Sequence, residues 1–486
     1  MSDGLFTLDQ SNIFGWFQIP YSKQTVEVLA SMDTKYGSEK DSTQKLFLKT
    51  KELCYETARS MKFNVSPNPI IIVNDGSFAV FCREHGVLLT PSYFMSSALA
   101  HEMVHDLNIG HSFSNRQIKV YPHAQPGEYD DKFDLMSTAN AFMHADGYGM
   151  NGPGLSGPHL DYLGWLPRSR MELVLPRQGR LTKTYRLASL SQKYDFTRGP
   201  LLLHIPYDGR NSQKTFTVEY RTKDKLDQGI PENFVIIHQI REKQDYLFSY
   251  LIPKSDTQLG WKAGDQYVYR LNSSPENASP QISIRIQRLA ADFAEILVET
   301  DFHPSICAED EIPRQLDPLD NVCVTVRSRA QVIGQTHPSA VGPNCPSGYV
   351  PRKASISDFR CITEAGKSLI HQQNRQYSDR SDLDAFIGST FGLNACQPGY
   401  LWRLIDDRDF VCVHPSQAED IRKQNLQRQF LSDGRGCRLN YVFRSAFPGD
   451  NVCVTPTDRL NAKFDSQNNL NRLRYPKFFN GIDDVQ

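Results

Sequence analysis

The spacing of the cysteines constrains the fold of this chain more than any other feature of its sequence. Eight of the ten cysteines form four pairs, and in each pair the second cysteine follows the first by 16 positions. This spacing is too wide for a pair to chelate a metal as a Cys-x-x-Cys motif does, and histidines are sparse in this region. The pairs are therefore predicted to be disulfides, which form in an oxidising compartment. They are Cys307 and Cys323, Cys345 and Cys361, Cys396 and Cys412, and Cys437 and Cys453.

The cysteine pairs belong to an internal repeat, predicted over residues 304–460 and followed by a tail at residues 461–486. Each repeat is expected to be a small hairpin closed by its disulfide, a bridge worth roughly 3 kcal/mol for a loop of about 15 residues. An arginine stands seven positions after the first cysteine, and an aspartate three positions before the second. These two are predicted to form a local ion pair, which would add little stability if it were exposed. They are Arg314 and Asp320, Arg352 and Asp358, Arg403 and Asp409, and Arg444 and Asp450.

The length and the charge of the chain exclude several classes of protein. A chain of 486 residues is too long for one ordinary core, so two to four domains are expected. The net charge of −1 argues against binding to nucleic acid or to an anionic membrane. No apolar stretch is long enough for a membrane span. The predicted disulfides favour a secreted protein, but the first residues show no signal-peptide pattern. We therefore expect that the start at Met1 is mature, truncated or misassigned. A protein of the reducing cytosol is the alternative.

Residues 169–303 are predicted to form an all-β, sandwich-like domain. Short runs of alternating apolar and polar residues recur there, separated by turn residues. The expected strands lie at residues 201–205, 215–220, 233–240, 246–252, 266–271, 281–287 and 294–299. No cluster of acid–base or metal-ligating residues occurs among them, so this domain is expected to support the first domain or to dock a substrate.

The first domain, predicted over residues 1–168, has a mixed α and β pattern. A helix is expected from residue 41 or 42 to residue 61, and strands are expected at residues 67–74, 77–82 and 86–90. Cys54 on the helix and Cys82 on the second strand are either a fifth disulfide or two separate buried cysteines. The sequence supports both interpretations about equally.

The stretch at residues 92–111 carries the residues with the clearest chemistry. It is predicted to begin as a helix capped by Thr90 or Ser92, and it contains His101-Glu102-x-x-His105. Positions i and i+4 of a helix lie about 40° apart round the axis, so both imidazoles project from one face. Two imidazoles in this arrangement can bind one zinc ion, and Glu102 beside them can act as a general base.

A third histidine can join the same ion only if the chain turns sharply after the helix. His111 would lie about 280° round the axis from His101 if the helix continued. Asn108 tolerates the left-handed conformation, and Gly110 follows it, so the sequence contains the residues that such a turn needs. The competing third ligand is a downstream carboxylate such as Glu128. We expect one Zn²⁺ ion bound by the three histidines.

Three aspartates downstream suggest a second cation. Asp130, Asp131 and Asp134 can bind Ca²⁺, but their spacing fits no calcium-loop template. Acidic residues in a turn are more often simply solvated.

The complete motif, His101-Glu102-x-x-His105-x-x-Asn108-x-x-His111, resembles the HExxHxxGxxH motif of the metzincin zinc peptidases, with Asn108 where that family usually has glycine. The segment ending at Met136 is similar to the metzincin Met-turn, which implies that Met136 lies beneath the imidazoles as an apolar floor. Residues 163–166, Leu-Gly-Trp-Leu, resemble the segment that follows the active site in gametolysin-like and immune-inhibitor-A-like peptidases. The resemblance covers about residues 90–300.

This resemblance implies a fold class and an activity. The fold is expected to be multidomain α+β: a metzincin-type zincin domain with a mixed sheet and an active-site helix, then the β-sandwich, then the disulfide-stapled repeats. The activity is expected to be zinc-dependent hydrolysis of peptide bonds in a protein or peptide substrate, with Glu102 as general base. The strand at residues 77–82 would then be the sheet edge that pairs with an extended substrate, and an interior strand is the alternative.

A second function stays open because the repeats resemble cysteine-containing repeats appended to microbial secreted proteins. In this alternative the chain is a secreted binding or adhesion protein whose repeats dock to a cell wall, another extracellular surface or a glycan. Its zinc domain would then be weakly active or inactive. The intact set of ligands and base favours the enzyme, because a relic would be expected to have lost Glu102.

Overall fold

The fold is described from a computed structural model of the chain, which divides into two compact units. The described residues are 16–36, 42–65, 70–73, 81–82, 86–89, 95–138, 140–147, 149–175, 181–208, 211, 213–243, 246–270, 282–300, 307–308, 310–317, 320–354, 358–376, 390–428, 430–432, 436–447 and 449–478. The first unit comprises Met1–Ser156, Lys223–Pro231 and Lys477–Gln486, and the second comprises Gly157–Thr222 and Glu232–Pro476. The predicted domain borders at residues 168, 303 and 460 do not coincide with this division and stay predictions. Within the described residues, no helix has both the length and the apolar character needed to cross a bilayer.

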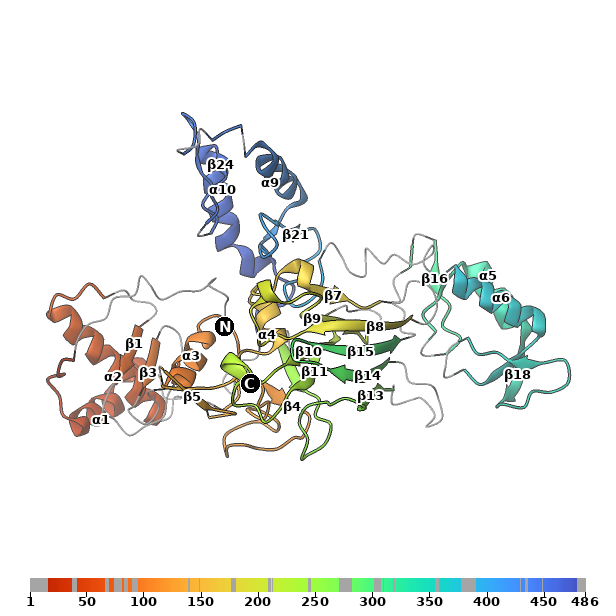
Figure 1. The fold of residues 1–486 in the computed structure, drawn as a ribbon, viewed down its shortest axis with the longest axis horizontal. Helices are drawn as coiled ribbons and strands as arrows, with labels where there is room; N and C mark the ends of the chain where they lie inside the picture. Colours follow the sequence, from red (N-terminus) through yellow and green to blue (C-terminus); the bar gives the residue numbers. More distant parts are fainter. Residues whose placement is uncertain are drawn as a thin grey trace. The chain divides into compact units, whose positions relative to one another are not determined.

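The first unit contains helices and a small mixed sheet (Figure 1). Its elements are α1 (Lys23–Met32), η1 (Thr34–Tyr36), α2 (Ser42–Ser60), β1 (Ile70–Val73), β2 (Phe81–Cys82), β3 (Gly86–Leu89), α3 (Ser96–His105), β4 (Phe113–Ser114), β5 (His144–Asp146), β6 (Gly149–Asn151) and η5 (Lys225–Asp227). The first two helices pack on each other, and the sheet has the order β1-β3-β2. Strand β1 runs parallel to β3, whereas β2 is antiparallel to β3 and lies at one edge. Both β2 and β3 contact α3, so the sheet and this helix pack together.

Several predictions for this unit can be compared with the structure. The helix predicted at residues 42–61 is confirmed by α2. Helix α3 begins at Ser96 after an N-cap at Met95, whereas the predicted caps Thr90 and Ser92 lie outside the described residues. The disulfide that the sequence left open is not formed, because Cys54 is a free thiol. Burial raises the pKa of this thiol to about 11.

The second unit is built on two sheets (Figure 1). Up to residue 300 its elements are α4 (Gly157–Tyr162), η3 (Arg168–Arg170), β7 (Met171–Leu173), β8 (Leu181–Ala188), η4 (Tyr194–Phe196), β9 (Leu202–Pro206), β10 (Thr215–Arg221), β11 (Phe234–Lys243), β12 (Tyr246–Leu251), β13 (Gln266–Tyr269), β14 (Ile282–Leu289) and β15 (Phe293–Thr300). Within this unit one sheet has the order β12-β11-β10-β9-β7 and the other has the order β13-β14-β15-β8. Strands β7 and β9 run parallel to each other. The helix α4 ends as the Leu-Gly-Trp-Leu segment begins, where Gly164 adopts a φ of 69°.

The two sheets share one hydrophobic core. Alternate side chains of each strand point to one face of a sheet, and alternate residues of β8, β9, β10, β11, β14 and β15 enter the same buried cluster. The cluster includes Tyr185, Leu187, Leu203, Ile205, Phe216, Val218, Val235, Ile237, Ile282, Ile284, Ile296 and Val298. All seven predicted strands are confirmed, while β7 and β8 were not predicted. Strand β7 has only three residues, and the first half of β8 is polar, so neither has a clear alternating pattern.

The four predicted disulfides are formed, and each closes a hairpin that leads into a helix. The elements of the repeats are β16 (Ile312–Pro313), β17 (Cys323–Val324), α5 (Val326–Gln335), β18 (Thr336–Val341), β19 (Val350–Pro351), β20 (Arg360–Ile362), α6 (Glu364–Arg375), β21 (Leu401–Trp402), β22 (Cys412–Val413), α9 (Pro415–Gln427), β23 (Val442–Phe443), β24 (Cys453–Val454), α10 (Pro456–Gln467) and η6 (Asn469–Arg472). The helices were not predicted. Each follows an N-cap that stands two positions after the second cysteine: Thr325, Thr363, His414 and Thr455. A threonine at this position in three of the four repeats was the signal that could have revealed them.

The arginine and the aspartate of each repeat form the predicted ion pair, and both residues are buried. In the third repeat, Nε and Nη2 of Arg403 donate to the two carboxylate oxygens of Asp409 at 2.7 and 2.9 Å. The same carboxylate accepts the backbone N–H of Ile405 at 3.1 Å. Leu404, between these donors, has a φ of 51°, and this turn aims both at the aspartate. The other three repeats have the same bidentate pair and the same positive φ after the arginine.

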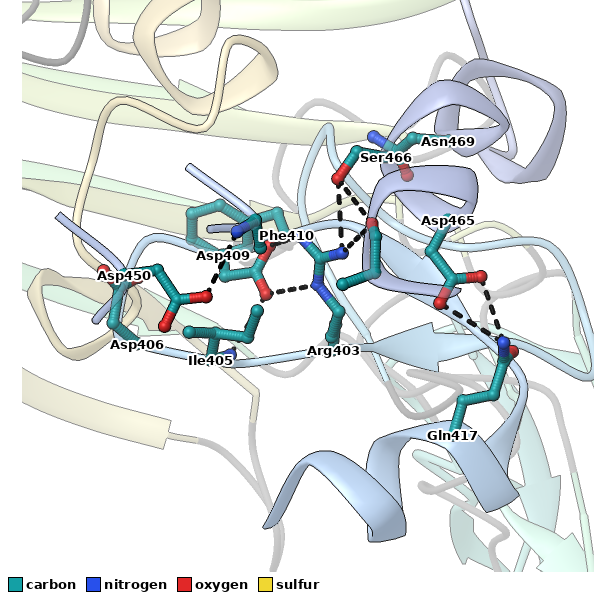
Figure 2. Close-up of polar contacts among 12 residues, drawn as sticks. Arg403, Ile405, Asp406, Asp409, Phe410, Gln417, Asp450, Asp465, Ser466 and Asn469 are labelled. Atoms are coloured by element: carbon teal, nitrogen blue, oxygen red, sulfur yellow. Dashed lines mark hydrogen bonds and ion pairs between the residues drawn. The ribbon is translucent and has the colours of Figure 1, made fainter. Parts of the chain in front are cut away.

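Each arginine also bonds to its neighbouring repeat, so the repeats form two pairs. Figure 2 shows the Arg403 guanidinium between Asp409 of its own hairpin and Ser466 of α10 in the fourth repeat. Arg444 of the fourth repeat donates in turn to two side chains of α9 in the third. The first two repeats make the equivalent exchange, in which Arg314 donates to α6 and Arg352 to the residue that caps α5. In each pair, the arginine of one repeat therefore forms hydrogen bonds with the other repeat.

The third repeat is attached to the sheets by a buried segment that precedes its first cysteine. The backbone N–H of Leu393 donates to the Asp161 carboxylate of α4 at 3.1 Å. The Gln213 amide donates to the Gly392 carbonyl at 3.3 Å. Gly392 has a φ of 75°, and a β-carbon there would meet the Asp161 carboxylate, so glycine is required at this position.

Replacing Asp409 by alanine tests the role of the buried pair. The substitution leaves the Arg403 guanidinium buried without its counter-charge, so we expect a loss of about 3–5 kcal/mol in the free energy of unfolding. Urea titration followed by tryptophan fluorescence measures the free energy of unfolding, since Trp402 of β21 directly precedes Arg403 in the chain. The matched control is Glu419→Ala, which removes an exposed partner of Arg422 and should cost less than about 1 kcal/mol. Equal effects of the two substitutions would contradict the role given to the buried pair.

Candidate metal centre

Helix α3 places two histidines and one glutamate on the side of the helix that faces the interior. His101 and Glu102 are 5 % and 8 % exposed, and His105 is half-buried. Ala98 and Val104 are buried with them, which fixes the orientation of the helix by apolar packing. Because His101 and His105 are four positions apart, their side chains lie above each other on this face.

The turn after α3 is the one that the sequence predicted. The helix ends at His105, and Asn108 donates its backbone N–H to the His105 carbonyl at 3.0 Å. Asn108 has a φ of 60°, the left-handed conformation that asparagine tolerates better than most residues. The chain then reverses, and His111 returns towards the helix.

The three imidazoles converge so that they could hold one metal ion. One ring nitrogen from each of His101, His105 and His111 lies within 4.8 Å of the others. The two Nε2 atoms of His101 and His105 are 3.2 Å apart. Tetrahedral zinc with bonds of about 2.0–2.1 Å to nitrogen separates two ligand nitrogens by about 3.3 Å, so this distance fits a shared zinc ion. These residues are the only group of potential metal ligands of this kind in the part of the chain that the structure describes.

The other nitrogen of each imidazole is held by a hydrogen-bond acceptor. Nδ1 of His101 is 2.8 Å from the Leu135 carbonyl, and Nδ1 of His105 is 2.8 Å from the Ile109 carbonyl. Nδ1 of His111 is 2.7 Å from the Glu128 carboxylate. An acceptor at Nδ1 selects the tautomer that carries its proton there, which leaves the Nε2 lone pair for a metal.

Burial favours the neutral form of the imidazoles. It lowers the pKa of His101, and it lowers that of His111 further, with a smaller contribution from the charges of His101 and His123. Metal binding requires a neutral imidazole, so burial prepares these side chains as ligands.

Glu128 lies behind His111 and is not one of the three residues that could hold a metal ion. The sequence offered it as a competitor of His111, but its Oε1 binds Nδ1 of His111, while its Oε2 accepts the backbone N–H of Gln125 at 2.7 Å. It is 1 % exposed. Carboxylates in this position orient a ligating imidazole and make it more basic. Sequence spacing could not reveal this, because the contact joins residues 17 positions apart across a loop.

The segment around Met136 is held close to the ligands by the backbone. The Met136 carbonyl accepts the Ser112 N–H at 3.0 Å, and its neighbour Leu135 accepts from His101. The Met136 side chain is fully buried. Its role as a floor beneath the imidazoles stays a prediction.

The three aspartates of this segment are engaged by donors of the protein. Asp130 accepts two hydrogen bonds from the Arg116 guanidinium. Asp131 accepts the backbone N–H of Phe133, and Asp134 accepts the backbone N–H of Met136. These contacts tie the loop together, and they give the suggested Ca²⁺ ion no support.

Tyr129 was not predicted as a site residue, and its ring packs against a ligand. Its centroid lies 3.9 Å from that of His111. Its φ of 63° is rare for so large a side chain and is stabilised by two backbone contacts, with Ser112 and Ser137. Burial raises the pKa of its hydroxyl, and the charges of Glu128 and Glu102 raise it further.

Comparison of the chain with known protein families, with curated proteins and with solved structures found no match.

The first prediction for this site concerns Glu128. Replacing it by alanine removes the acceptor from Nδ1 of His111, so we expect the affinity for zinc to fall by about 10- to 100-fold. Competition with a fluorescent zinc chelator measures the affinity. The matched control is Glu128→Gln, which keeps an acceptor oxygen and should bind zinc more tightly than the alanine variant. The role of Glu128 is wrong if the alanine variant binds zinc as the wild type does.

The second prediction concerns the turn after α3. Glycine at position 108 suits a φ of 60°, so Asn108→Gly should bind zinc at least as tightly as the wild type. Valine resists this conformation, at a cost of roughly 1–2 kcal/mol, so Asn108→Val should weaken both zinc affinity and thermal stability. The same chelator competition and a thermal melt compare the two variants. Equal zinc affinities would show that the turn does not control His111.

Proposed function

We propose that this chain is a secreted, zinc-dependent endopeptidase of the metzincin type. The observation that carries the proposal is the convergence of three imidazoles, each held at Nδ1, with a buried glutamate on the same helix. Three histidine ligands leave a fourth position of a tetrahedral ion open, as catalytic zinc sites do. The HExxHxxNxxH motif and the Met136 segment support the same assignment by resemblance.

In the proposed hydrolysis of a peptide bond, the zinc ion and the side chain of Glu102 have different roles. Zinc, when bound in such a site, supplies the Lewis acidity that lowers the pKa of a water molecule and polarises a carbonyl group. Glu102 follows His101 directly in α3, and its side chain is buried. It would accept the proton of the water as the peptide carbonyl is attacked, and then pass that proton to the leaving amine. Buried charge is costly, so a carboxylate kept at this position suggests a chemical role.

The edge of the first sheet suggests where a substrate would bind. Strand β2 is at the end of the order β1-β3-β2, and it contacts α3, which carries two of the ligands. An extended peptide that paired with this edge would run alongside the metal ligands of α3. Backbone pairing of this kind binds peptides with little regard to sequence, which suits an endopeptidase.

The disulfides support the location of the enzyme. Four bridges in the repeats suggest an oxidising setting, because such bonds do not persist in a reducing cytosol. We extend this to secretion, which fits a peptidase that acts on proteins outside the cell.

Binding by the repeats is a second candidate function. It is supported by large apolar side chains that are exposed in the third and fourth repeats: Leu426, Phe430 and Leu439 are 79 %, 69 % and 89 % exposed. Exposed apolar side chains that gather on one surface commonly mark an interaction site. A wild-type chain that binds zinc and cleaves nothing would favour this function over the first.

Replacing Glu102 tests the proposed enzyme. The wild type should bind about one zinc ion per chain and cleave an unfolded protein such as reduced casein. Glu102→Ala removes the base and keeps the ligands, so zinc should still bind while the rate falls by about 10²- to 10⁴-fold. Glu56→Ala, which removes an exposed carboxylate of α2, is the matched control and should keep full activity. Bound zinc without cleavage by the wild type would contradict the proposal.

A further inference from the structure

A row of aromatic rings extends from the metal ligands to the protein surface. Tyr129 packs against His111, and Tyr121 meets Tyr129 edge-on with 5.2 Å between the ring centroids. His123 then stacks on Tyr121 almost in parallel, at 5.4 Å and an angle of 3°. We call these three residues, Tyr129, Tyr121 and His123, the aromatic row.

The outer end of the aromatic row is accessible. Tyr121 is 38 % exposed, and His123 is exposed as well. Ile118, in the same loop, is 42 % exposed. A flat ring stack beside an apolar side chain presents a surface that is better suited to another apolar group than to water.

The loop that carries the aromatic row is rigidly built. Arg116 forms a bidentate pair with Asp130, and the Gly127 N–H donates to the Ile118 carbonyl at 2.9 Å. Gly127 has a φ of 85°, and a β-carbon there would collide with the Ser114 carbonyl. A surface fixed in this way binds a ligand without first losing conformational freedom.

The charges of the loop decide which apolar group fits. Residues 115–127 include Arg116, Lys119 and His123 and no acidic residue. The carboxylate of Asp130 neutralises only Arg116. At the outer end of the row, Lys119 disfavours a cationic side chain on the ligand, whereas an aromatic side chain can stack on the exposed ring pair of Tyr121 and His123.

We propose that the aromatic row is the subsite that binds an aromatic side chain of the peptide substrate. The proposal rests on the peptidase function proposed above and adds the substrate class. The row begins on a metal ligand, and an extended peptide advances about 3.3–3.5 Å per residue, so the aromatic residue lies within about four residues of the scissile bond. Tyr121 is the residue that selects it.

The first experiment locates the preference. Zinc-loaded wild-type protein is incubated with a library of peptides from a digested proteome, and the cleavage sites are read by mass spectrometry. We expect Phe, Tyr or Trp to be enriched at one position within about four residues of the cleaved bond. Tyr121→Ala should lower kcat/KM about tenfold for a peptide with Phe at that position and leave a matched peptide with Gly unchanged. Phe196→Ala removes an aromatic ring of the second unit that is more exposed than Tyr121, at 81 % against 38 %, and is the control.

The second experiment measures binding without catalysis. In the Glu102→Ala background the zinc-loaded protein should bind the labelled Phe peptide about tenfold more tightly than the Gly peptide, by fluorescence anisotropy. Adding Tyr121→Ala should abolish this difference without changing zinc stoichiometry. Enrichment of Lys or Arg, no enrichment, or a Phe preference that survives Tyr121→Ala would overturn the subsite while the peptidase stands. A wild type that cleaves no peptide would overturn both.

Discussion

The candidate metal centre depends on the termination of helix α3 at His105. A helix that continued past His105 would carry His111 to the far side of the axis, about 280° from His101. The left-handed turn at Asn108 reverses the chain instead, and three imidazoles meet. Asparagine achieves this because its short polar side chain tolerates a conformation that costs most residues roughly 1–2 kcal/mol.

The loop that follows the turn keeps the ligands in one arrangement. Residues from 111 to 137 close on themselves, since Ser112 bonds to Met136 and Gly127 bonds to Ser114. This closure brings Leu135 and Glu128 behind two imidazoles, where they fix the tautomers. All the ligands and their acceptors therefore come from one continuous stretch within the first unit, and the same loop presents the aromatic row.

The second unit achieves stability in two different ways. The two sheets bury a large apolar cluster, as extended alternating strands allow. The repeats are too small for such a core, and they combine a disulfide with a buried arginine–aspartate pair. A buried charge is costly unless every donor and acceptor is satisfied, and the neighbouring repeat completes that requirement. We infer that this reciprocity is why the repeats associate in pairs, because one repeat alone would leave its arginine short of partners.

Much of this protein was determined by local sequence. The disulfide pairs followed from a constant spacing, the strands from period-two alternation, and the turn at Asn108 from the conformational preference of one residue. The repeat helices were missed although their N-cap threonines are a local signal, whereas the surroundings of several other residues depend on contacts between segments. Whether Arg403 and Asp409 are exposed depends on α10 packing over them, and whether Glu128 is a ligand or an acceptor depends on how a loop closes. Likewise, whether Cys54 forms a disulfide depends on the tertiary structure, in which it is a free thiol. The sequence by itself determined which residues carry the chemistry and which local turns they make. Only the tertiary structure decided what surrounds these residues, because burial and hydrogen bonds to other segments arise from packing between segments.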